Sequence, residues 1–188
     1  MDIYQHIDLM LPYINRRDWT SLEAEYKQLA TRLAGPEVAN AISSVEIVEY
    51  ETALRNAMAS AYEKIEQSSA AKAIAAKAIY FEYDLDNFWQ SNFFICQDYN
   101  SLVAADEDWA CDWIEEVKGP EFQAFAELYD STHGFDTTDL DKGTTLYLVA
   151  RTVAAFGRCA EHFLIKPYAL CLAFHDQDPI MRIKELDR

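Results

Sequence analysis

The sequence predicts an α+β fold, in which N-terminal helices precede a small antiparallel β-sheet with a long amphipathic helix packed on it. Three observations predict this class. Apolar residues recur at helical spacing up to about residue 77, and the period becomes two residues from Ile79. A helical period then returns at Leu146 and holds for about five turns. A chain of 188 residues suits one domain, 1–188, with a helical part of about 1–77 and a sheet-and-helix part of about 78–188.

The helical part divides at its prolines and glycines. Residues 2–15 carry one apolar stripe and predict a helix that Pro12 bends or shortens. The next helix is capped at Thr20 or Ser21 and stops at Gly35-Pro36. The segment 37–67 contains neither Gly nor Pro, which predicts one long helix or two collinear ones.

The strands follow from alternation. Ile79, Phe81, Tyr83 and Leu85 alternate with polar neighbours, and "SNFFICQDY" gives a second strand after a turn within 86–90. "DWACDWIEEV" predicts a third strand with Trp109, Cys111 and Trp113 on one face, and "EFQAFAELY" a short helix. "ALCLAFHDQDPIMRIKE" predicts two strands around a turn. Alternating β-α-β units with Gly-rich turns are absent from the sequence, which argues against a nucleotide-binding parallel sheet.

Negative charge is concentrated in the middle of the chain. The net charge is −16, and the window from Glu82 to Asp141 holds sixteen acidic residues and one base, Lys118, a net charge of −15. Such a field repels nucleic acid and anionic membrane surfaces and attracts basic proteins. We therefore expect a basic protein partner, no nucleic acid and no membrane.

The termini, apolar runs and cysteines indicate a cytoplasmic protein. The N-terminus begins acidic and lacks the features of a signal peptide, and charges interrupt every apolar run well before a membrane span of roughly 20 residues. The four cysteines form no Cys-x-x-Cys pair and lie in apolar neighbourhoods, which predicts buried free thiols. We expect no cofactor.

Two acidic motifs are candidate sites. In "YDLDN", alternation puts Glu82, Asp84 and Asp86 on one polar strand face. The motif lacks the residues that complete a phosphatase or an EF-hand, so a solvated face is favoured over a metal or catalytic site. In "DEDWACDW", Asp108 and Asp112 would share the face opposite Trp109 and Trp113. Those tryptophans are either core residues or aromatic anchors ringed by acids.

The turn between the first two strands carries two large rings. Phe88 and Trp89 stand where small polar residues are usual, so they either fold back onto a helix or are displayed. If the two rings were exposed beside Asp84, Asp86 and Asp98, rings and carboxylates together would form a negatively charged surface suited to binding a basic protein.

The segment "YFEYDLDNFWQSNFFICQDYN…DWACDWIEEVKGP", about residues 79–120, resembles small acidic immunity proteins of bacterial polymorphic and contact-dependent toxin systems. The resemblance lies in tryptophans and carboxylates on adjoining strands of a small acidic α+β protein. It implies neutralisation of a cognate toxin domain, often a basic nuclease, by direct binding. No residue role carries over from that family.

The sequence thus favours a non-enzymatic antitoxin-like binding protein. We expect the partner-binding residues to be Glu82, Asp84, Asp86, Phe88, Trp89, Asp98, Asp108, Trp109 and Asp112. Two alternatives stay open. One is a metal-dependent hydrolase or transferase using Asp84, Asp86 and His175, and the other is a structural or self-assembling protein in which displayed aromatics form a homodimer seam.

Overall fold

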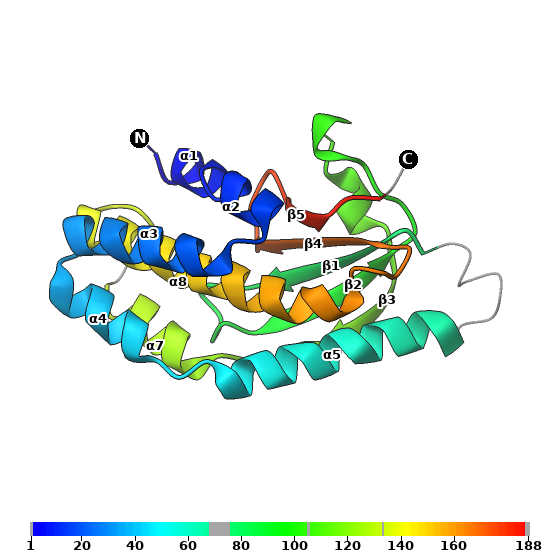
Figure 1. Ribbon diagram of the computed structural model, residues 1–188, viewed down its shortest axis with the longest axis horizontal. Helices are drawn as coiled ribbons and strands as arrows, with labels where there is room; N and C mark the ends of the chain where they lie inside the picture. Colours follow the sequence, from blue (N-terminus) through cyan, green and yellow to red (C-terminus); the bar gives the residue numbers. More distant parts are fainter. Residues whose placement is uncertain (1, 68–75, 105, 133, 187–188) are drawn as a thin grey trace. The chain divides into compact units, whose positions relative to one another are not determined.

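A computed structural model describes residues 2–67, 76–104, 106–132 and 134–186 (Figure 1). The α-helices are α1 (Ile3–Asp8), α2 (Leu11–Arg16), α3 (Trp19–Leu33), α4 (Pro36–Ser44), α5 (Val48–Gln67), α7 (Gln123–Asp130) and α8 (Asp139–Ala160). Short 3-10 helices are η1 (Leu102–Ala104), η2 (Asp108–Cys111) and η3 (Glu161–Phe163). The strands are β1 (Ala78–Tyr83), β2 (Ser91–Cys96), β3 (Trp113–Lys118), β4 (Ala169–Phe174) and β5 (Met181–Lys184). The predicted α+β class is confirmed.

The chain divides into two compact units, each assembled from segments that are far apart in the sequence. Unit 1 comprises Met1–Glu49, Leu85–Trp89 and Phe122–Arg158. Unit 2 comprises Tyr50–Asp84, Gln90–Glu121 and Cys159–Arg188, and it contains the sheet. A single domain over 1–188 stays a prediction.

The N-terminal helices begin and end at identifiable residues. Pro12 lies in the first turn of α2, so the expected helix over 2–15 is in fact two short helices. The cap of α3 is Asp18, whose side chain accepts a hydrogen bond from the Ser21 amide at 3.2 Å, and not Thr20 or Ser21. Gly35, at a φ of 92°, and Pro36 end α3 as predicted.

The helix predicted from Leu146 onward is confirmed as α8, but its surroundings differ from the expectation. Residues 143–157 are all buried, including the polar side chains of Thr144, Thr145, Arg151 and Thr152. A helix that is enclosed on every side is a core element rather than an amphipathic one. The sequence conceals this because threonine hydroxyls can bond within the helix, as Thr152 does to the Leu148 carbonyl at 3.0 Å.

Within unit 2, the described strands form one five-stranded sheet in the order β3-β2-β1-β4-β5 (Figure 1). The hairpin of β1 and β2 and the pair of β4 and β5 are antiparallel, as expected. However, β1 and β4 are parallel, with Ala78 opposite Ala169, so the sheet is mixed and not wholly antiparallel. A parallel pair requires a long connection, which the chain between β1 and β4 supplies.

The expected third strand begins later than predicted. Asp108–Cys111 forms η2, and β3 starts only at Trp113. The prediction that Trp109, Cys111 and Trp113 share one strand face is therefore wrong, since Trp109 is buried while the other two are exposed. All four cysteines are free, and Cys111 alone is exposed. Burial raises the pKa of Cys96 to about 12, which leaves that thiol unreactive.

Candidate partner-binding site

The connection between β2 and β3 is long for two neighbouring antiparallel strands. It runs over residues 97–112, of which 105 lies outside the described part of the chain. Hairpin connections usually take about 2–5 residues, and longer ones are often functional. We call residues 97–112 the acidic excursion, because it carries five acidic residues and no basic one: Asp98, Asp106, Glu107, Asp108 and Asp112.

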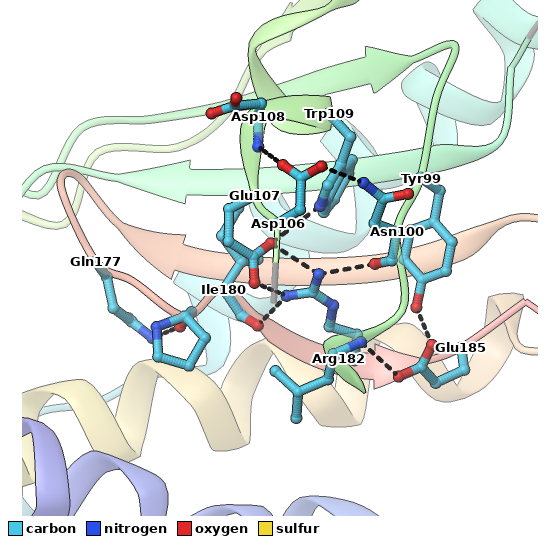
Figure 2. A network of polar contacts seen from close by, with 12 residues as sticks. Tyr99, Asn100, Asp106, Glu107, Asp108, Trp109, Gln177, Ile180, Arg182 and Glu185 are labelled. Carbon is cyan, nitrogen blue, oxygen red and sulfur yellow. Dashed lines mark hydrogen bonds and ion pairs between the residues drawn. The ribbon is translucent and has the colours of Figure 1, made fainter. Parts of the chain in front are cut away.

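A buried ion pair holds the acidic excursion to β5. The guanidinium of Arg182 donates from Nη1 and Nη2 to the two carboxylate oxygens of Glu107, each at 2.7 Å. Nη2 also donates to the Asn100 carbonyl at 2.8 Å, and Nη1 donates to the Ile180 carbonyl. Figure 2 shows the guanidinium pointing into this group of acceptors. The Arg182 side chain is 3% exposed and that of Glu107 is 17% exposed, so the pair is well shielded from water.

Two aromatic rings complete the environment of Arg182. Its guanidinium carbon lies 5.3 Å from the centre of the Trp109 ring and 5.8 Å from that of Tyr99. The Trp109 indole donates to Glu107 at 2.9 Å. Burial lowers the pKa of Arg182, but the hydrogen bonds and charge of Glu107 outweigh burial and leave the pKa raised. The arginine is therefore permanently charged.

Trp109 also covers one face of the sheet. It lies in a buried cluster with Tyr80, Cys96, Cys171 and Ile180, and its ring meets that of Tyr80 edge-on at 6.3 Å. Burying a ring of this size stabilises the sheet by roughly 2–3 kcal/mol. The acidic excursion is thus anchored by the buried ring of Trp109 and by the ion pair of Glu107 with Arg182.

Further polar contacts order the acidic excursion on both sides of Glu107 (Figure 2). The Asp106 carboxylate accepts from the Asn100 side chain at 3.1 Å and from the Asp108 amide at 3.0 Å. The Tyr99 hydroxyl donates to Glu185, which also accepts from the Leu102 amide at 3.5 Å. These hydrogen bonds hold the backbone of the acidic excursion in place.

The ordered backbone presents negative charge to solvent. Asp98, Asp106, Asp108 and Asp112 are exposed. Asp98 pairs with Lys77 at 2.7 Å, but among the described residues no cation pairs with Asp108 or Asp112. Apolar atoms lie beside them in the chain, since Val103 is 89% and Trp113 48% exposed.

Two predicted anchors are buried, which corrects the expectation that they contact a partner. Trp89 is 0% exposed and donates its indole N–H to the Thr152 hydroxyl at 3.0 Å. Trp109 is 3% exposed and packs against the sheet, where it holds the acidic excursion in place. Phe88, the neighbour of Trp89, is 58% exposed and is displayed.

The three carboxylates expected on one strand face are separated. β1 ends at Tyr83, so only Glu82 belongs to the strand, while Asp84 and Asp86 lie in the following turn. Glu82 accepts from the Tyr80 hydroxyl at 2.8 Å and lies 3.3 Å from Nδ1 of His175. Asp86 belongs to unit 1, where burial, and after it Asp86, raise the pKa of the Tyr129 hydroxyl. Alternation fails here because β1 ends at Tyr83, before Asp84 and Asp86 are reached.

The contact of His175 with Glu82 makes a pH-dependent prediction. Burial lowers the pKa of His175, but Glu82, Asp176 and Asp84 outweigh burial, and the pKa is raised from 6.5. A raised folded pKa stabilises the fold fully below 6.5, and this contribution is lost as pH rises through the folded value. In Glu82→Gln we expect an NMR titration of the His175 ring to give a lower pKa. Asp178→Asn, in the same turn, should leave it unchanged, and equal effects of both variants would contradict the assignment.

Two further findings concern alternative functions. Across the described residues, no three His, Cys, Asp or Glu side chains are grouped so as to hold a metal ion. No described helix is both long enough and apolar enough to cross a membrane. Asp84, Asp86 and His175 therefore do not form such a metal-binding group in the structure.

The sequence reasoning missed the residues that organise the candidate site: Tyr99, Asn100, Glu107, Arg182 and Glu185. A signal was present for Arg182. It stands between the apolar residues Met181 and Ile183, and a charge at such a position usually has a specific partner. The sequence around Arg182 does not show which acid pairs with it, because that acid lies far away in the chain.

Comparisons of the chain with protein-family models, curated proteins and solved structures found no match.

Proposed function

We propose that this chain is a non-enzymatic binding protein whose acidic excursion recognises a basic protein, and that it acts as a cytoplasmic immunity protein against a toxin domain. The observation that carries the proposal is the bidentate ion pair of Arg182 and Glu107, which orders a surface with four exposed carboxylates, Asp98, Asp106, Asp108 and Asp112. A loop ordered in advance loses less conformational entropy on binding.

The arrangement of charge fits recognition more closely than it fits stability. Exposed carboxylates without partners, such as Asp108 and Asp112, repel one another in the free protein. Facing a basic protein, they would raise the association rate and reject acidic competitors. If every acid of the excursion were paired with a cation of the same chain, as Glu107 is paired with Arg182, the excursion would no longer attract a basic protein.

Apolar contacts would come from residues other than the predicted tryptophans Trp89 and Trp109. Trp113 follows Asp112 directly and packs on Phe94, with ring centres 5.5 Å apart, while about half of its surface remains exposed. An exposed tryptophan fixed by a neighbouring ring is well suited to be a binding hot spot. The partner surface is thus Asp98, Asp106, Asp108, Asp112 and Trp113.

The immunity role follows from the resemblance in the strand region together with this surface. A basic toxin, such as a nuclease, has a cationic active site that an acidic surface could cover. The net charge of −16 disfavours nucleic acid itself as the ligand.

The test is a comparative capture from the source cell at low salt. The bait Asp108→Asn/Asp112→Asn loses two negative charges from the excursion, and the bait Glu46→Gln/Glu49→Gln loses two exposed ones from unit 1. We expect a basic protein to be retained by the wild type and by the unit 1 variant but depleted with the excursion variant. With the purified partner, association at low salt should be roughly tenfold slower for the excursion variant.

The immunity role has its own readout. Co-expression of the chain should restore growth to cells that express the captured partner, and the excursion variant should restore it less well. A partner that the two double variants bind equally would contradict the proposed surface. A partner that is harmless to cells would contradict the immunity role while leaving the surface intact.

A further inference from the structure

A second site lies in unit 1, among α1, α2 and α3. A pocket of about 360 Å³ is formed there, within the range usual for small-molecule sites. Its lining combines apolar and aromatic side chains with the ionisable residues His6, Arg16, Glu25 and Arg32.

The walls of this pocket are mostly apolar and are held in place. Leu9, Pro12 and Leu29 supply aliphatic surface, and Tyr13 supplies an aromatic ring. Tyr26 is buried, and its hydroxyl donates to the His6 carbonyl, which ties α3 to α1. The hollow is therefore preformed rather than created by a ligand.

Two arginines, Arg16 and Arg32, line the pocket, and both have exposed side chains. No ion pair involves Arg16 or Arg32 among the described residues, whereas six other bases are paired with acids: Lys64, Lys77, Lys118, Arg158, Lys166 and Arg182. The Arg16 guanidinium carbon lies 5.2 Å from the centre of the Tyr13 ring, which places it over the aromatic wall. Both arginines lie in the last turn of their helices, where positive charge is favourable in any case, so a functional role requires a separate test.

The histidine of the pocket reports the local electrostatics. Burial lowers the pKa of His6, and nearby cations, including Lys142 and Arg32, lower it further against the opposing effect of Asp2. The surroundings of His6 are thus electropositive, in a chain whose net charge is −16. Glu25 also lines the pocket, so a ligand with one negative charge fits better than one with several.

We propose that this pocket binds a small organic monoanion, a carboxylate carried on an aromatic or alkyl body. The apolar walls would take the body, and Arg16 and Arg32 would take the carboxylate. Guanidinium groups match the geometry of a carboxylate, and such charge-assisted bonds are about twice as strong as neutral ones. This site is independent of the acidic excursion, whose residues all belong to unit 2.

A matched series of probes tests the ligand class. Saturation-transfer NMR and calorimetry would compare 3-phenylpropionate with 3-phenylpropanamide and 2-phenylethylamine, which keep the ring and change the charge. We expect the carboxylate to bind about tenfold more tightly than the amide, and the amine to bind most weakly. Equal binding of the three probes, or binding of none, would overturn the proposal.

Substitutions then assign the binding to this pocket. Arg16→Gln and Arg32→Gln should each weaken the carboxylate about tenfold and leave the weak amide signal unchanged. Arg55→Gln is the control, because Arg55 is an exposed arginine of α5. If Arg55→Gln weakened carboxylate binding equally, the loss would reflect only the change in net charge. That result would overturn the assignment of binding to this pocket.

Discussion

Replacing Arg182 by methionine is expected to lower the free energy of unfolding by about 3–5 kcal/mol. Methionine preserves much of the aliphatic volume but removes both hydrogen bonds to Glu107 and those to the Asn100 and Ile180 carbonyls. The carboxylate of Glu107 would remain shielded without its cation. Urea denaturation followed by circular dichroism measures the loss directly.

The control for Arg182→Met is a solvent-exposed ion pair of the same unit. Lys64 and Glu115 are 2.9 Å apart with side chains 44% and 42% exposed, so Lys64→Met should cost about 1 kcal/mol or less. Adding Glu107→Leu to Arg182→Met should recover part of the loss, because the unpaired charge is then removed. If Lys64→Met and Arg182→Met lowered the free energy of unfolding by similar amounts, burial would not make the Arg182 pair more important for stability than an exposed pair.

Trp89→Ala is expected to destabilise the protein by about 3–5 kcal/mol. The ring is fully buried and meets Phe125 edge-on at 5.6 Å and Tyr129 at 6.0 Å, and its N–H bonds to Thr152. Truncation leaves a large cavity and removes a buried hydrogen bond. Thermal and urea unfolding would measure the effect.

The adjacent ring provides a matched control for Trp89→Ala. Phe88 has nearly the same backbone conformation, with a φ of 56° against 53° for Trp89, but its side chain is exposed. Phe88→Ala should therefore change stability by no more than about 0.5 kcal/mol. If it costs as much as Trp89→Ala, then the strained turn, and not packing, explains both values.

Local patterns explain why much of the fold was predictable. Helical spacing located α3 and α8, and Gly35-Pro36 marked the end of α3. Alternation found the hairpin of β1 and β2, and the turn residues between β4 and β5 indicated the second hairpin. The parallel pairing of β1 with β4 joins segments that are far apart in the chain, and nothing local encodes it. The 3-10 turn at Asp108–Cys111 replaced a strand because Trp109 folds back onto the sheet, which is a tertiary effect.

The candidate site was predictable in its charge but not in its anchors. The concentration of acids in the middle third can be counted in the sequence, and Asp98, Asp108 and Asp112 are exposed as expected. The tryptophans were ambiguous because a large ring beside acids suits both a core and a binding surface, and Trp89 and Trp109 proved to be buried. Arg182 could not be matched to Glu107, since 75 residues separate them.

We propose that a basic protein docks on residues 97–112. The most direct measurement is amide hydrogen exchange of this chain, free and bound to the basic protein that the charge-sensitive capture identifies. Slower exchange on binding in the peptides covering 97–104 and 106–116 is the predicted result. Slower exchange confined to unit 1, with those peptides unchanged, would contradict it.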